Sequence, residues 1–208
     1  MFIHRLPELP RGMTAVAQIL GGPLAPGISG SVWFRDVPCG VEICVRICGL
    51  PPYRPAVGEE PPIGPHGFHI HEFGCCDIGD PGNPFTAAGE HWNPTNQPHG
   101  NHPGDFPVLF SNNGFSKMCF FTNRFKVADI VGKSVIIHQN PDDYRTQPAG
   151  AAGKRLACGI ITSFYKNSCR SAHQGYNEKT YLRDTPSPSF RLQLIISHQN
   201  KTKNVYRY

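Results

Sequence analysis

The chain has 208 residues, which is enough for one domain with a sizeable core. Charged residues make up only 17% of it, the net charge is +5, and lysine and arginine are scattered rather than clustered. This composition argues against a highly charged disordered chain and predicts no nucleic-acid partner.

Glycine and proline, at 22 and 21 residues, are frequent, which favours short strands joined by turns over long helices. No apolar run reaches the ~18 residues of a membrane span, so no membrane partner is expected. The first residues contain no signal-peptide core, and the sequence as written predicts a cytoplasmic protein.

Three strands are predicted in the first quarter of the chain, over residues 14–22, 28–37 and 41–50. The third alternates strictly, with Val41, Ile43 and Val45 on one face. Cys44 and Cys48 lie in the same apolar run, and both are expected to be buried thiols.

The rest of the chain alternates between strands and two large polar loops. Residues 51–65 form a proline-rich connection, and further strands are predicted over 67–73, 108–111, 115–122, 134–138 and 156–164. The loops cover 74–107 and 142–154, and a loop as long as the first is usually functional. With no convincing amphipathic helix, the pattern predicts an all-β antiparallel barrel or sandwich with two large loops on one side.

Three parts are expected along the chain. Residues 1–13 form an N-terminal arm, 14–166 the barrel, and 167–208 a polar C-terminal extension that is partly disordered. Within the extension, residues 190–197 are compatible with either a strand or a short helix.

Most of the chemistry lies in seven side chains that can bind metal: His69, His71, His91, His99, His102, Asp105 and His138. Residues two apart on a strand share a face, so His69 and His71 project together. A tight turn can fold His99, His102 and Asp105 around one ion. Each of these histidines, taken alone, is also compatible with a solvated surface residue. Seven donors are too many for one tetrahedral site but fit two neighbouring four-ligand sites if one imidazole is shared.

Asp142 follows His138 by four residues. It can accept hydrogen bonds from the outer nitrogens of ligand histidines, which would fix their tautomers. As part of the run Asn140 to Asp143 it is equally compatible with an ordinary turn.

Five stretches in order resemble the copper–zinc superoxide dismutase family: GFHIHEFG from Gly67, GEHWNPTNQPHG from Gly89, HPGD from His102, SVIIHQNPDD from Ser134 and GKRLACG from Gly153. The resemblance covers about residues 14–164. It implies an eight-stranded antiparallel Greek-key barrel with two long functional loops. It also implies disproportionation of superoxide to dioxygen and hydrogen peroxide at a histidine-bridged copper–zinc site.

The same resemblance assigns roles to individual residues. It implies a copper ion on His69, His71, His91 and His138, and a zinc ion on His91, His99, His102 and Asp105. His91 would bridge the metals and carry a proton, Asp142 would link a copper ligand to a zinc ligand, and Arg155 would guide the anion. Cys158 would form a disulfide with Cys76 or Cys75, of which Cys76 is favoured. Superoxide is the implied substrate, and a homodimer is compatible with the family. Apart from the resemblance, Arg145 and Lys154 lie in the same short loop as Arg155 and are compatible either with an extension of its positive surface or with ordinary solvated surface charge.

The chain departs from the family pattern in several places. The interval from His71 to His91 is longer than usual, that from His99 to His102 is shorter, and Ala149 stands where many members have threonine. One alternative is therefore a non-catalytic dismutase-like module that binds copper or zinc. A zinc hydrolase would need an open zinc position, which Asp105 is expected to fill.

Overall fold

The computed structural model describes residues 12–164. The expectations for the N-terminal arm up to residue 11 and for the C-terminal extension lie outside the described residues. None of the helices in the described part is long and apolar enough to cross a membrane.

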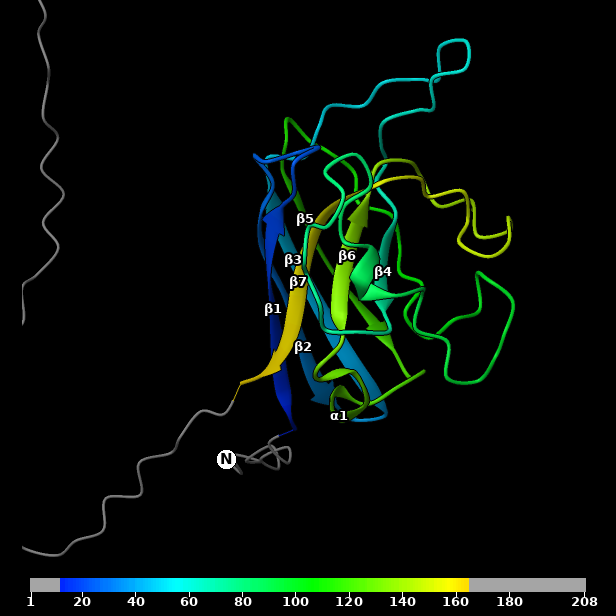
Figure 1. Ribbon diagram of the computed structural model, residues 1–208. Helices are drawn as coiled ribbons and strands as arrows, with labels where there is room; N and C mark the ends of the chain where they lie inside the picture. The colour runs from blue at the N-terminus through cyan, green and yellow to red at the C-terminus, as the bar shows by residue number, and fades with distance from the viewer. Residues whose placement is uncertain (1–11, 165–208) are drawn as a thin grey trace, which may run out of the picture. The chain divides into compact units, whose positions relative to one another are not determined.

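Within residues 12–164, seven strands form one antiparallel sheet in the order β4-β6-β7-β1-β2-β3-β5 (Figure 1). The strands are β1 (Thr14–Gly21), β2 (Ser29–Val37), β3 (Gly40–Cys48), β4 (Phe68–His71), β5 (Ser116–Thr122), β6 (Ser134–His138) and β7 (Arg155–Ser163). The helical elements described are a 3-10 turn, η1 (Thr86–Ala88), and one turn of α-helix, α1 (Val127–Ile130). The all-β architecture predicted from the sequence is confirmed.

Strict alternation builds the core. On β3, every second residue is buried, namely Val41, Ile43, Val45 and Ile47. Ala15, Ala17 and Ile19 of β1 are buried on the same inner side of the sheet. Phe34, Phe68 and Phe106 meet inside the curled sheet, with ring centroids 5.2 Å apart for Phe68 and Phe106. Burying side chains of this size contributes roughly 1.5–3 kcal/mol each.

The expected strand over 108–111 is wrong, and the described residues hold seven strands where the resemblance implied eight. The segment around Leu109 lies along β4 and exchanges two backbone bonds with His66, of 2.8 and 2.9 Å. Pro107 has no N–H to donate, so a regular ladder cannot continue past it. This segment occupies an edge of the sheet as isolated bridges.

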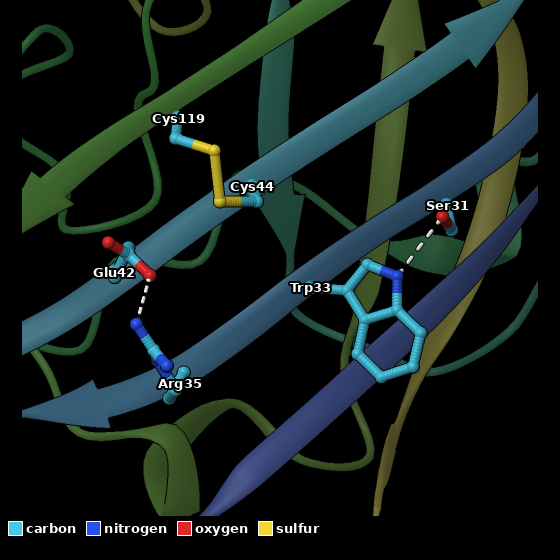
Figure 2. Close-up of a disulfide and its surroundings, with 6 residues drawn as sticks. All are labelled: Ser31, Trp33, Arg35, Glu42, Cys44 and Cys119. Atoms are coloured by element: carbon cyan, nitrogen blue, oxygen red, sulfur yellow. Dashed lines mark hydrogen bonds and ion pairs between the residues drawn. A yellow bond between two sulfur atoms is a disulfide. The ribbon is translucent and has the colours of Figure 1, made fainter.

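The expectation that Cys44 and Cys48 are buried thiols is also wrong. Alternation places both on the outer face of β3, where Cys48 is an exposed free thiol. Cys44 lies directly opposite Cys119 of β5, and the two form a disulfide across the strands. Figure 2 shows this disulfide on the sheet surface, with the ion pair between Arg35 of β2 and Glu42 of β3 nearby.

Candidate metal centre

Two groups of four possible ligands lie side by side and share His91. One consists of His69, His71, His91 and His138, and the other of His91, His99, His102 and Asp105. In each group the potential ligand atoms lie within 4.8 Å of one another. The structure therefore brings together all seven donors that the sequence singled out.

Strand β4 is the scaffold of the site. His69 and His71 are both fully buried on it, and β4 pairs on one side with β6, which ends at His138. On its other side, backbone bridges join His71 to His91 and His69 to Asp105. The segment from His91 to Asp105, which carries the remaining donors of the long loop, is thus attached to β4 at both of its ends.

In the first group, His69, His71 and His138 each have one ring nitrogen that points away from the other ligands, and a hydrogen-bond acceptor holds this outer nitrogen. His69 Nε2 lies 2.7 Å from Asp142 Oδ2. Nδ1 of His71 lies 3.0 Å from the carbonyl oxygen of Gly89, and Nδ1 of His138 lies 3.2 Å from that of Gly153. Since carboxylates and carbonyls accept protons in hydrogen bonds, these contacts place the imidazole proton on the outer nitrogen. The inner nitrogens keep their lone pairs, and those of His71 and His138 are 3.2 Å apart.

The second group is arranged in the same way. His99 Nε2 lies 2.8 Å from Asp142 Oδ1, and His102 Nε2 lies 3.0 Å from the carbonyl oxygen of Gln97. Their Nδ1 atoms face inward, 3.2 and 3.3 Å from Asp105 Oδ2. Three imidazole nitrogens and one carboxylate oxygen form a donor set typical of tetrahedral zinc.

His91 is the exception, because it belongs to both groups and each of its two ring nitrogens faces possible metal ligands. Its Nδ1 lies 3.1 Å from Asp105 Oδ1 in the second group. Its Nε2 is directed at the first group and is buried without a hydrogen-bond partner in the described part of the chain, as are Nδ1 of His69, His99 and His102. Unpaired buried nitrogens are costly, roughly 1–3 kcal/mol each, and metal ions at both ends of the ring would remove this cost. The residues therefore fit one metal ion in each group.

The acid–base state of the site also suits metal binding. Burial lowers the pKa of His69 and of His71 well below the ordinary value, and the charges of neighbouring imidazoles lower it further. Burial likewise lowers the pKa of His138, to about 3. Burial alone would raise the pKa of Asp105, but its hydrogen bond with His91 and the nearby imidazole charges outweigh it, so that pKa is lowered. At neutral pH these groups are in the unprotonated forms that bind metal.

Asp142 connects the two groups through His69 and His99 and also accepts a 2.7 Å bond from the backbone N–H of Tyr144. Gly150 lies against it with φ +62°, and a Cβ at that position would overlap the Asp142 carboxylate and lie 2.5 Å from His99 Nε2. The close approach and the positive φ together require glycine there.

Arg155 begins β7 beside the first group. Its guanidinium donates to the carbonyl oxygens of Phe85, at 2.6 Å, and Gly89, at 2.7 Å. The Gly89 carbonyl therefore orients both Arg155 and His71 of the first group. Burial lowers the pKa of Arg155, while the charge of Glu90 opposes the shift. Arg145 and Lys154 are exposed.

A second disulfide joins the long loop to β7. It links Cys76 to Cys158, while Cys75 remains a free, half-buried thiol. Phe85, Ala88 and Ile136 pack around this disulfide in a small separate cluster. The loop segment that supplies the carbonyl partners of Arg155 is therefore cross-linked to the strand that carries Arg155.

Sequence reasoning missed several groups that support the site. The carbonyls of Gly89, Gly153 and Gln97 could not be found, because every residue has a carbonyl. Tyr144 ties the second loop to the first by donating to Phe106 O and accepting from Val108 N, both at 3.0 Å. His66 is fully buried with Nδ1 2.9 Å from His138 O, and its place three residues before His69 was the only available signal.

Comparisons with known proteins agree with this geometry. Residues 28–161 match the family described as copper/zinc superoxide dismutase (SODC). "Superoxide dismutase [Cu-Zn]" of Deinococcus radiodurans is 33% identical over 151 residues, covering 64% of this chain and 77% of that protein. The protein of the same description from Legionella pneumophila is 35% identical over 160 residues, with 71% and 89% covered. The solved structure of Cu/Zn superoxide dismutase from Brucella abortus superposes with a TM-score of 0.58 at 29% identity, covering 71% of this chain and 98% of that one.

Proposed function

The chain belongs to the copper/zinc superoxide dismutase family, and on that premise we propose that it disproportionates superoxide to dioxygen and hydrogen peroxide. The proposed copper ligands are His69, His71, His91 and His138, and the proposed zinc ligands are His91, His99, His102 and Asp105.

One observation carries the proposal: His91 presents a nitrogen to each donor group. Its Nδ1 lies beside Asp105 and its Nε2 is buried without a hydrogen-bond partner among the described residues. A ring that only filled space in the core would need a hydrogen-bond acceptor for its proton and a donor for its other nitrogen. A ring shared by two metal ions needs neither.

Copper, when bound, supplies the chemistry that protein side chains lack, because it accepts one electron from a superoxide anion and returns one to a second. Zinc has no redox role and is proposed to hold His91, His99 and the loop between them.

The protein's own residues bind and orient the anion and supply a proton. The Arg155 guanidinium, fixed by two carbonyl oxygens, offers its remaining N–H groups to a small monoanion beside His71 and His138. His91 Nε2 is a site where a proton can be held and passed to the reduced product. Exposed Arg145 and Lys154 lie in the second loop and add positive charge that attracts anions from solution.

The proposal is tested by measuring metal content and activity on one sample. Protein loaded with both metals is expected to contain copper and zinc in equal amounts and to quench superoxide far above the same concentration of free copper. His138→Ala is expected to lose copper and activity while retaining zinc, and Gln139→Ala serves as the adjacent control. Stoichiometric metal binding without activity above free copper would refute the proposal and favour a non-catalytic metal-binding module.

A further inference from the structure

We propose that Arg124, which lies outside both donor groups, is a positioning residue for the zinc ligand His102. It acts through a closed ring of four hydrogen bonds. The inference rests on the proposed function, because it takes the second donor group to be a zinc site.

The ring runs through four side chains and two carbonyls. Arg124 Nη1 donates to the carbonyl oxygen of His102 at 2.9 Å, and Nη2 donates to Asn101 Oδ1 at 2.7 Å. Asn101 Nδ2 donates to Gln97 Oε1 at 3.1 Å. Gln97 accepts from His102 Nε2 at 3.0 Å through its own carbonyl oxygen, which closes the ring.

The last of these bonds selects the tautomer of His102. A neutral imidazole carries one N–H, and only a donor can pair with a carbonyl. The proton therefore sits on Nε2, and the lone pair on Nδ1 points inward beside Asp105, 3.3 Å from Oδ2. If Gln97 moved away, the proton could occupy Nδ1 and block the nitrogen that has to bind the metal.

Among the described residues, the other bonds that hold Gln97 come from its own loop, and one of them, from Asn93 Nδ2 at 2.8 Å, reaches the same carbonyl oxygen that accepts from His102. Gln97 and Asn101 are exposed, and their remaining bonds are local, such as the 2.9 Å bond from Gln97 N to Asn93 Oδ1. Arg124 is the member of the ring that comes from outside the loop, from the connection between β5 and α1. The next residue, Phe125, is buried against Trp92 with ring centroids 5.8 Å apart, so the anchor is attached to the core.

Arginine suits this position better than lysine. Its planar guanidinium presents two N–H groups in a fixed fork, which here reach the His102 carbonyl and Asn101 at once. A lysine ammonium would bond one of the two well. Most hydrogen bonds of the turn between His99 and His102 stay within the long loop, such as that from Asn101 N to Pro98 O at 3.1 Å, whereas Arg124 ties the turn to the segment that follows β5.

The test compares Arg124→Gln and Arg124→Lys with the wild type, and uses Arg35→Gln as a matched control. Arg35 is an exposed arginine of β2 that pairs with Glu42 of β3, at 2.7 Å, and takes no part in the ring. Zinc affinity is measured by competition with a chromogenic chelator. The His102 tautomer is measured separately in the zinc-free protein from its imidazole nitrogen shifts.

Arg124→Gln is expected to weaken zinc binding by roughly 10-fold or more and to populate the Nδ1-protonated form of His102. Arg124→Lys should lie in between, and Arg35→Gln should stay within about twofold of wild type. Unchanged zinc affinity and tautomer in Arg124→Gln would overturn the ring proposal, as would a loss explained fully by lower thermal stability with the tautomer unchanged. Wild-type protein that binds zinc but does not dismutate superoxide would refute the proposed function and leave the ring intact.

Discussion

Asp142 offers the sharpest test of how the two donor groups are coupled. Its carboxylate is buried, and its two oxygens accept from His69 Nε2 at 2.7 Å and from His99 Nε2 at 2.8 Å. Asp142→Asn keeps the shape of the side chain but leaves one acceptor oxygen. The amide therefore cannot hold both imidazoles in the tautomer that presents Nδ1 to a metal.

The size of the effect follows from the bond that is lost. A hydrogen bond to a charged group contributes about 1.5–3 kcal/mol, and 1.4 kcal/mol corresponds to a tenfold change in a binding constant. Loss of an outer acceptor of a ligand histidine commonly weakens metal affinity roughly 10–100-fold. Asp142→Asn should therefore weaken at least one of the copper and zinc affinities by that factor, and Asp142→Ala should weaken both.

The assay is competitive titration of each metal into the metal-free variants, with thermal unfolding as a check on folding. Asp143→Asn is the matched control, because Asp143 is the adjacent carboxylate but is exposed and bonds only within its own turn, to Arg145 and Thr146. Wild-type affinity for both metals in Asp142→Ala would refute the reasoning. So would an equal loss in Asp143→Asn.

Three further outcomes are expected. Arg155→Gln should lower kcat/KM for superoxide by roughly tenfold and flatten its dependence on ionic strength, measured by pulse radiolysis; an unchanged salt dependence would contradict the docking role. Replacing Cys44 and Cys119 together by serine should lower the free energy of unfolding by up to about 4 kcal/mol, because the disulfide closes a separation of 75 residues; denaturant titration that shows no change would contradict this. Burial lowers the pKa of His71 and of His138, to about 3 for His138, so the unfolded state binds their protons more readily than the folded state. The metal-free protein should therefore lose stability as pH falls from about 6.5 towards 3, and a melting temperature that does not fall over this window would count against it.

The sequence predicted what depends on residue type and on the period of two. Alternation identified β3 and its buried face, and histidine and aspartate identified the seven donors, since few other side chains bind copper or zinc. Contacts between distant segments could not be predicted in the same way. Cys44 meets Cys119 only because β3 pairs with β5 in one particular register, and a single sequence does not specify that register.

The sequence also could not predict how many segments join the sheet as regular strands. The apolar residues around Leu109 resemble a strand, and Leu109 is buried beside His66. Whether such a segment forms a ladder depends on a donor at each alternate position, and Pro107 removes one of them. The local pattern was therefore right about burial and wrong about the strand.

The groups of the site that the sequence could not identify are those that fix the tautomers of the histidines. In three of the six histidines, the proton is placed by a backbone carbonyl: that of Gly89 for His71, of Gly153 for His138 and of Gln97 for His102. Every residue has a backbone carbonyl, and where that carbonyl points depends on the conformation of the chain. The residue types therefore do not show which carbonyls will meet a histidine. We therefore expect the elements that fix this conformation, namely the disulfide of Cys76 and the contacts of Arg155 and Arg124, to act on metal affinity without touching a metal. Ligand spacing alone is not sufficient for the centre, and a chain with all seven donors but a differently held loop would present several of its imidazoles in the wrong tautomer.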